Sequence, residues 1–132
     1  MPVGKKKRYY NRFQKHLNDI FVHLEEGDYV QASEKVWGAI SSLVNATFSL
    51  ERKGIKDKKE GFVTLYRSLS VKHPHLRDIL KQNCFKNAND LITKASGLHE
   101  YFYGGRDYPE KYLKNVIEGC AKVLEEIDNV SK

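Results

Sequence analysis

Residues 29–53 carry apolar side chains on two adjacent stripes of one predicted helix. The first stripe alternates larger side chains with alanine at coiled-coil spacing, in the order Tyr29, Ala32, Val36, Ala39, Leu43, Ala46 and Leu50. The second stripe consists of Ser33, Trp37, Ile40, Val44 and Phe48. Alanine in a seam lets a neighbouring helix approach closely, and a helix with two apolar sides must cover both. We therefore expect this helix either to lie in the middle of a bundle or also to form a subunit interface.

The segment before this helix predicts a helical hairpin. Apolar residues recur at three- and four-residue steps from about residue 5 to residue 26, which indicates a first helix with one apolar face. Gly27 can adopt the left-handed conformation that ends a helix, and the carboxylate of Asp28 can cap the amide three residues later. The first two helices should therefore run antiparallel, joined by a tight turn.

The middle of the chain predicts shorter and less regular elements. Residues 54–61 are strongly charged and bounded by glycines, so we expect a loop there. A short helix should follow and end at His73, because Pro74 lacks an amide and disfavours helical geometry in the residue before it. Residues 75–82 should add one or two turns of helix.

Two further helices are predicted in the last third of the chain. One spans about residues 84–102, and the other starts after Asp107, which would cap it with Pro109 in the first turn. No segment alternates as a strand. The prediction is a single all-α domain over residues 1–132, an antiparallel up-and-down bundle of about five helices, with residues 1–8 as a basic, frayed N-terminus.

Basic residues are concentrated in two places in this chain, whose formal net charge is +6. One cluster precedes the first acidic residue, Asp19, and the other lies in the charged segment of residues 52–59. Such clusters attract polyanions, although exposed lysines also serve simply to keep a surface soluble. The candidate nucleic-acid-binding residues are Lys5, Lys6, Lys7, Arg8, Arg12, Lys56, Lys58 and Lys59.

Several classes of protein do not fit this sequence. No apolar run approaches the roughly 18 residues of a membrane span, and no apolar segment follows the basic N-terminus as in a secretory signal. We expect a cytoplasmic protein with no membrane contact. Cys84 and Cys120 lack metal-site spacing, as do the histidines, so we expect no metal and no cofactor. Each cysteine is expected to be a small buried side chain, and the sequence leaves open whether the two are free or bonded.

Two segments carry a resemblance to a known family. The first is Gly27-Asp28-Tyr29-Val30-Gln31-Ala32-Ser33-Glu34-Lys35-Val36-Trp37-Gly38-Ala39, and the second is Ala95 followed by Leu98-His99-Glu100-Tyr101-Phe102-Tyr103. Both resemble the archaeal PaREP-type family, which is grouped with HEPN-like domains. Tyr101 stands where that family usually has asparagine, and Gly104 replaces the acidic residue that commonly follows.

The resemblance implies a HEPN-like bundle that pairs into a homodimer. Many HEPN proteins are metal-independent ribonucleases or parts of toxin–antitoxin and defence systems, and they use an arginine and a histidine four to six residues apart. Others have lost catalysis and serve as binding domains. The resemblance thus implies two different functions, and it does not choose between them.

Arg67 and His73 have the spacing that the HEPN motif requires. Histidine near its ordinary pKa can act as acid or base on a ribose hydroxyl, and arginine can hold the phosphate. Six arginines and five histidines also produce such a pair by chance in a chain of this length. Ser68 and Pro74, the neighbours of the pair, are unusual for an active motif.

A second candidate polar site lies at the end of the helix predicted at residues 84–102. It consists of His99, Tyr101, Tyr103 and Arg106. A positive imidazole would be favoured by the dipole at a helix C-terminus. The alternative is a structural histidine that is hydrogen-bonded within the bundle. Trp37 lies on an inner stripe, so we expect it in the core or at a dimer contact rather than stacked on a base.

The functional hypothesis from the sequence is a non-catalytic interaction or RNA-binding module. It rests on the basic clusters and on the unusual neighbours of the Arg67–His73 pair. The alternative is a metal-independent ribonuclease that uses this pair. Partners consistent with the sequence are a second copy of the chain, RNA or another polyanion, and a different protein.

Overall fold

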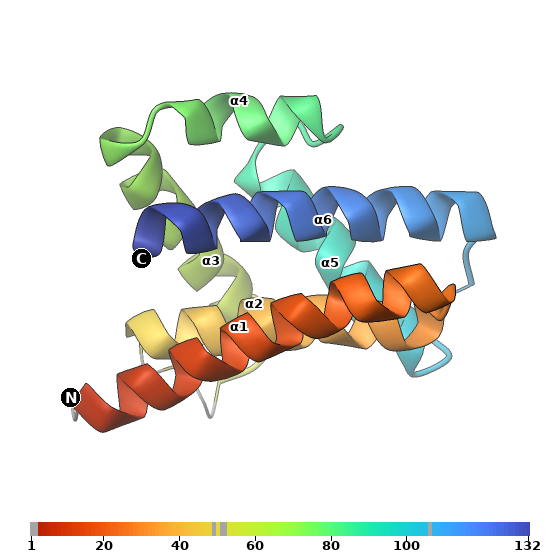
Figure 1. Cartoon of the computed structure of the whole chain (residues 1–132). Helices are drawn as coiled ribbons and strands as arrows, with labels where there is room; N and C mark the ends of the chain where they lie inside the picture. The colour runs from red at the N-terminus through yellow and green to blue at the C-terminus, as the bar shows by residue number, and fades with distance from the viewer. Residues whose placement is uncertain (1–2, 49, 51–52, 106) are drawn as a thin grey trace.

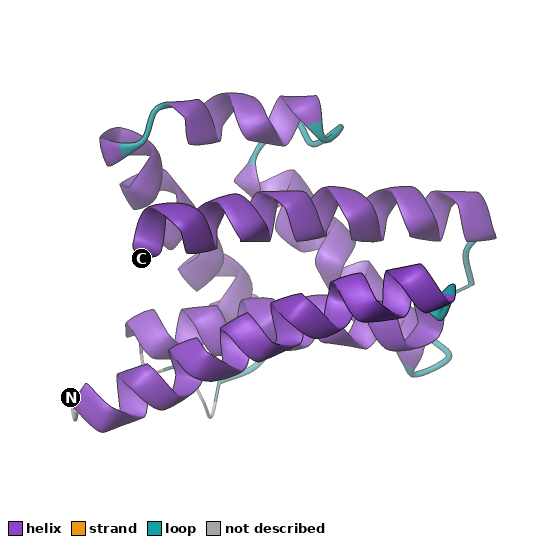
Figure 2. Ribbon diagram, in the orientation of Figure 1, coloured by secondary structure: helices purple, strands orange, loops and turns teal. Residues whose placement is uncertain are grey.

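The computed structural model describes residues 3–48, 50, 53–105 and 107–132. Every secondary-structure element in these ranges is a helix, and short loops connect the helices (Figure 2). The elements are α1 (Val3–Glu26), α2 (Tyr29–Phe48), α3 (Ile55–Lys72), α4 (His75–Gln82), α5 (Ala88–Phe102) and α6 (Glu110–Ser131). The predicted all-α class is confirmed. The described part has six helices rather than about five, because the segment after Pro74 forms a separate helix, α4.

The three longest helices, α1, α2 and α6, run along one another, and the other three lie behind or above them (Figure 1). α1 and α2 form an antiparallel hairpin, and α6 returns along α1. α3 and α5 cross behind α6, while α4 covers the top of the bundle in this view. No described helix is both long enough and apolar enough to cross a membrane.

α2 is the central element, as its two apolar stripes predict. It packs on α1, α5, α6 and α3, and its most extensive neighbour is α1. α1 approaches α2 closely at Gly38, where a Cβ atom would come within 3.3 Å of the His16 ring. Ala32 and Ala39, on the first stripe, are completely buried. Trp37, on the second stripe, is only 6% exposed. Most of the apolar face is therefore covered within one chain, and Phe48 at the end of the second stripe is the exception, at 38% exposed.

The turn between α1 and α2 has the predicted conformation. Gly27 has a φ of +74°, and its amide and that of Asp28 donate to the carbonyls of Leu24 and His23, at 3.1 and 2.9 Å. This pair of bonds is the Schellman arrangement, which satisfies carbonyls at the end of a helix. The Asp28 carboxylate then accepts from the amide of Gln31 at 3.2 Å and caps α2.

The predicted loop at residues 54–61 is wrong. α2 ends at Phe48 rather than at residue 53, and α3 begins at Ile55. Gly61 lies inside α3 because the helix passes close to α2. A Cβ atom at this position would come within 2.8 Å of a methyl carbon of Val44. This glycine therefore reflects a close approach of two helices and not a break between them.

The predicted start of the fifth helix, near residue 84, is also wrong. α5 begins at Ala88, and the Asn87 side chain caps it by accepting from the amide of Asp90 at 2.8 Å. Before the cap, Cys84 has a φ of +68°, and Phe85 turns into the core. The Phe85 ring packs where α6 has glycine, at position 119, so this connection is held by packing rather than by helical bonds.

Two further expectations near the end of the chain need correction. Asp107 does not cap α6, because Pro109 precedes the first helical residue with an extended ψ of 142°. Asp107 instead accepts from the amide of Tyr108 at 3.1 Å. Cys84 is exposed, whereas Cys120 is buried as expected, and both cysteines are free. Burial raises the pKa of the Cys120 thiol to about 12, so this thiol stays protonated at neutral pH.

The burial of Trp37 predicts a large cost for its removal. Trp37→Ala should lower the free energy of unfolding by about 3–5 kcal/mol, because it leaves a cavity where the indole ring now packs near His99 of α5. Urea unfolding of the two proteins measures this difference. Val71→Ala is the control, since Val71 is 73% exposed and its truncation should change stability by less than about 0.5 kcal/mol. A loss below about 1 kcal/mol for Trp37→Ala would contradict the core placement.

Candidate functional site

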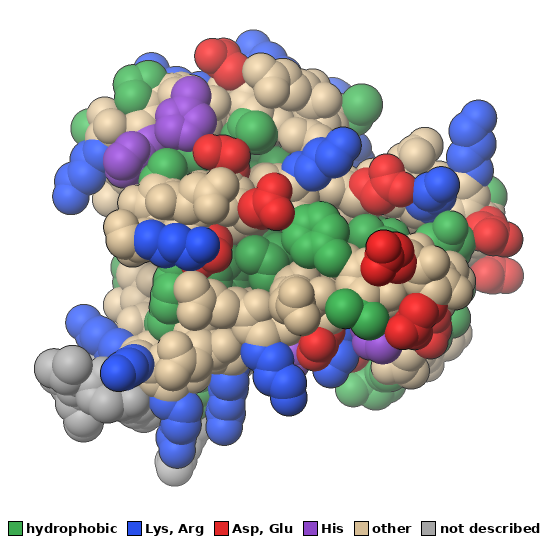
Figure 3. Space-filling model, viewed as in Figure 1, with side chains coloured by type: hydrophobic (Ala, Val, Ile, Leu, Met, Phe, Trp, Pro, Cys, Tyr) green, Lys and Arg blue, Asp and Glu red, His purple; other side chains and the backbone are tan. Residues whose placement is uncertain are grey.

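The outer face of α1 carries a row of exposed cations. Tyr9, Phe13 and Leu17 face inward and are buried, so the cations between them point to solvent. We call the following residues the basic row: Lys7, Arg8, Arg12 and Lys15. Lys6 is exposed too, but it lines another depression beside Leu43 of α2. The side chain of Lys5, also predicted for this cluster, lies outside the described part of the chain. Figure 3 shows Lys and Arg side chains along the lower left edge of the molecule, where α1 begins.

The charges of the basic row are not neutralised within the chain. Among the described residues, none of its four members forms an ion pair with a carboxylate. The guanidinium carbons of Arg8 and Arg12 instead lie 6.0 and 5.4 Å from the centre of the Tyr9 ring. The row surrounds a shallow depression of about 370 Å³, lined by Lys7, Arg8, Asn11, Arg12 and Lys15. These cations are free to pair with an external anion.

A polar contact between the first and last helices holds α1 in place. The hydroxyl of Tyr10 donates to Oδ1 of Asp128 at 2.6 Å, and Nε2 of Gln14 donates to the same atom at 3.1 Å. Nζ of Lys132 lies 3.3 Å from the other carboxylate oxygen. Burial alone would raise the pKa of Asp128, but the bonds from Tyr10, Gln14 and Lys132 outweigh it and lower that pKa. Burial, followed by the bond to Asp128, raises the pKa of Tyr10.

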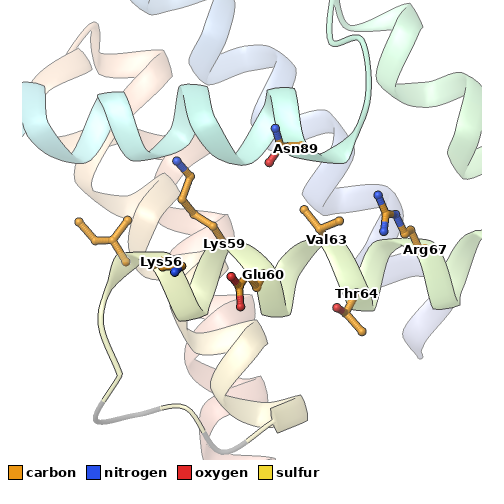
Figure 4. A pocket seen from close by; sticks show the side chains of 8 residues that line it. Lys56, Lys59, Glu60, Val63, Thr64, Arg67 and Asn89 are labelled. Carbon is orange, nitrogen blue, oxygen red and sulfur yellow. The ribbon is translucent and has the colours of Figure 1, made fainter.

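The second basic cluster is divided between two sides of α3. Lys56, Lys59 and Arg67 line a groove of about 680 Å³ that Asn89 of α5 closes on one side. Figure 4 shows Lys59 and Arg67 reaching toward the space in front of Asn89. Lys58 lies elsewhere, because its ammonium donates to Oγ of Ser41 on α2, and burial lowers its pKa. The three lysines predicted as one cluster therefore do not act at one place.

Arg67 and His73 do not face one position in a single chain. α3 ends at Lys72, and His73 follows it with non-helical backbone angles, φ −131° and ψ 78°. Arg67 lines the groove between α3 and α5, whereas His73 ends α3 with its ring 6.2 Å from that of His75. Nε2 of His75 is in turn 3.5 Å from Oε1 of Glu126 on α6. The histidines thus belong to the contact between α4 and α6.

The second predicted site is also divided by the structure. Nδ1 of His99 lies 3.1 Å from Oε2 of Glu34, and its ring lies between those of Trp37 and Tyr103, at 5.5 and 5.1 Å. His99 therefore links α5 to α2, as in the structural alternative. Tyr101 packs instead on Tyr108, with ring centres 6.0 Å apart. Arg106 lies outside the described residues.

The groove contains residues that the sequence did not single out. Asn89 and Val63 both line it, and neither belongs to a motif. The spacing of Lys56, Lys59, Val63 and Arg67 defines one side of a helix only if residues 55–61 are helical. Because a loop was predicted there, this shared side was not recognised. A helical interpretation of residues 55–61 would have placed these four together.

The Tyr10–Asp128 contact predicts a specific dependence on pH. The pKa of Asp128 is lower in the folded chain than in the unfolded one, so its ionised form stabilises the fold above about pH 4. This contribution is lost as the pH falls further, through the folded-state pKa. Asp128→Asn should cost about 1–2 kcal/mol at neutral pH and make the decline in unfolding free energy below about pH 4 shallower.

Urea unfolding between pH 2.5 and pH 7 measures both effects. Glu125→Gln is the matched control, because Glu125 lies on the same helix and is exposed. The control should follow the wild-type curve throughout. An acid decline of the same slope in Asp128→Asn and the wild type would show that this carboxylate does not link α1 to α6.

Comparison with known proteins supports the family resemblance. Residues 10–118 match the archaeal PaREP1/PaREP8 family, and this range contains α2 to α5, most of α1 and the beginning of α6. Searches of the curated proteins and of the solved structures gave no match. Because the matched range covers most of the chain, the protein is a member of the archaeal PaREP1/PaREP8 family.

Proposed function

We propose that this protein is a non-catalytic RNA-binding module that contacts the RNA backbone through the basic row of α1. The observation that carries the proposal is the lack, among the described residues, of internal carboxylate partners for the four exposed cations of this row. Cations that remain hydrated and unpaired in the folded chain can release phosphate counterions at little cost on binding. From Lys7 to Lys15 the row extends about 12 Å along the helix, enough for several phosphates.

The geometry favours backbone contacts over recognition of bases. Tyr9 is the aromatic residue at the basic row, and it is buried beneath the guanidinium groups of Arg8 and Arg12. A base cannot stack on a ring that is covered on its exposed side. Contacts from lysine and arginine to phosphate position a nucleic acid without reading its sequence. We therefore infer affinity with little sequence preference.

The structure gives less support to the ribonuclease alternative. Acid–base catalysis needs a histidine and a phosphate-binding group at the same reacting phosphate. Arg67 lines the groove beside α5, whereas His73 follows the end of α3 and its ring lies 6.2 Å from that of His75.

A second candidate function is protein binding at the opposite end of the molecule. Tyr103 is 70% exposed, and Val30 and Tyr112 are also exposed near the α1–α2 turn and the α5–α6 connection. Acidic side chains gather at this end, on the right in Figure 3. Glu25 and Glu26 lie at the end of α1, and Glu110, the first residue of α6, lines a depression with Gly27 and Asp28. Aromatic residues with a charged rim are typical of protein interfaces. Light scattering of the wild type and of Tyr103→Ser tests the homodimer that the HEPN-like resemblance implies.

The proposal predicts that RNA affinity depends on the location of the cations and not only on their number. Replacing Lys7, Arg8, Arg12 and Lys15 by glutamine should weaken binding of a labelled single-stranded RNA at least about tenfold. It should also reduce the slope of log Kd against log salt by up to about 3, since each lost phosphate contact contributes about 0.7. Fluorescence anisotropy at a series of salt concentrations measures both quantities.

The control carries the same loss of charge on other helices. Lys81, Lys111, Lys114 and Lys122 are exposed on α4 and α6, and their glutamine variant should keep most of the affinity and slope. Equal effects of the two variants would leave only a nonspecific charge effect. Cleavage of the RNA by the wild type in the presence of chelator, and no cleavage by the Arg67→Ala/His73→Ala variant, would contradict the proposal. That result would support the ribonuclease alternative.

A further inference from the structure

We propose that the pocket between the start of α2 and the α5–α6 connection binds a lysine or arginine side chain from a basic segment of a partner protein. Its volume of about 260 Å³ is below the range of drug-sized ligand sites and suits a single side chain. The inference names the partner chemistry for the second candidate function, protein binding at this end, and rests on it. No member of the basic row lines the pocket, so the inference does not depend on RNA binding.

Three tyrosines from separate parts of the chain line this pocket. Tyr29 is the first residue of α2, Tyr101 belongs to the last turn of α5, and Tyr108 lies in the connection before α6. All three are partly buried, and the ring centres of Tyr101 and Tyr108 are 6.0 Å apart. The face of a tyrosine ring is electrostatically negative and attracts a cation within about 6 Å of its centre. Walls of this kind favour a cation that carries an aliphatic stem.

The position of Tyr108 is determined by packing on both neighbouring helices. A Cβ atom at Gly97 of α5 would come within 2.6 Å of the Tyr108 hydroxyl oxygen, so the glycine leaves the space that this ring occupies. On the other side, the Tyr108 ring centre is 5.1 Å from that of Tyr112 on α6. This wall of the pocket is therefore formed before a ligand binds, which lowers the entropy lost on binding.

Two carboxylates give the pocket a negative charge. Asp28 and Glu110 line it, and no lysine, arginine or histidine among the described residues does so. In the described part of the chain neither carboxylate forms an ion pair. Oδ1 of Asp28 accepts from the amide of Gln31, and an ionised carboxylate has room for further donors. A cation in the pocket would therefore meet both aromatic faces and carboxylate oxygens.

The helix dipoles at the pocket offset one another. α1 and α5 end beside it, whereas α2 and α6 begin there, at the right-hand end of the molecule in Figure 1. The negative ends of the first two dipoles thus face the positive ends of the other two, and the carboxylates determine the net charge. A phosphate or an acidic segment would be repelled, which excludes a nucleic-acid backbone as the occupant.

Apolar surface at the edge of the pocket indicates a segment of chain rather than a free amine. Val30 lines the pocket and is 44% exposed, and Tyr112, which packs on Tyr108, is 40% exposed. Residues on either side of a bound cation can cover these two side chains, whereas a small amine leaves them in water. A protein partner with a basic segment is therefore the occupant that uses the whole surface.

A peptide with one cation tests the pocket. The probe is acetyl-Gly-Leu-Ser-Lys-Ser-Leu-Gly-amide, and NMR of the isotope-labelled full chain measures its Kd up to millimolar values. Replacing the peptide's lysine by norleucine should weaken binding at least about tenfold, because it removes the charge and keeps the aliphatic stem. Asp28→Asn/Glu110→Gln should weaken binding of the lysine peptide to a similar extent, and asparagine preserves the cap of α2. Asp78→Asn/Glu125→Gln removes the same charge from exposed sites on α4 and α6 and should leave Kd unchanged.

A pair of substitutions at Tyr101 tests the aromatic wall. Tyr101→Leu keeps an apolar side chain but removes the ring face, so binding of the lysine peptide should weaken at least about threefold. Tyr101→Phe keeps the ring and should bind the peptide as the wild type does. Urea unfolding of both variants checks that the fold is intact. Equal Kd values for the leucine and phenylalanine variants would overturn the cation–π contact.

The remaining outcomes decide the proposal. Loss of binding with the norleucine peptide and with the Asp28/Glu110 variant, but not with the control, supports it. Equal affinity for the lysine and norleucine peptides, or no saturable binding at millimolar concentration, overturns it. Butylammonium that binds as tightly as the peptide would overturn the partner segment in favour of a small amine. Peptide binding that is lost in Tyr103→Ser but kept in the Asp28/Glu110 variant would overturn the pocket and leave protein binding at this end intact.

Discussion

The close packing of α1 on α2 is the constraint on which the other features depend. Gly38 of α2 leaves room for the His16 ring of α1, because a Cβ atom there would come within 3.3 Å of that ring. The alanine seam lies beside Gly38 on α2, and its members Ala32 and Ala39 are completely buried. The second stripe of α2, which includes Trp37, is then available for α5, and His99 joins that contact through Glu34. Every other helix except α4 makes extensive contact with α2. A larger side chain in the alanine seam would therefore disturb the whole bundle and not one helix pair.

This packing also explains where the positive charge lies. One face of α1 is used by Phe13, Leu17 and Ile20 in the core, so its cations can lie only on the outer face. α3 is different, because it approaches α2 at Gly61 and turns another side toward the start of α5. The two cationic surfaces thus arise for different reasons. The first is the solvent side of an amphipathic helix, whereas the second is a cationic stripe beside a neighbouring helix.

Local signals in the sequence were sufficient for part of this architecture. The turn at Gly27 and Asp28 needs only backbone conformation and one cap, and both depend on adjacent residues. Gly61 could not be interpreted in this way, since its reason is the Val44 side chain of another helix. The position of Phe85 could not be predicted from neighbouring residues either, because its ring packs on α6. The exposed cations of α1 could be predicted from periodicity alone, but the groove depends on Asn89 meeting α3, which is a property of the tertiary structure.

The Tyr10–Asp128 contact joins residues that are 118 positions apart. During synthesis the α1–α2 hairpin can form early, since its turn is closed by neighbouring residues. Its Tyr10 hydroxyl then has no carboxylate to meet until the ribosome has released the chain beyond residue 128. α1 therefore remains partly uncovered until α6 docks on it. During that interval the like charges on the outer face of α1 disfavour association between nascent chains.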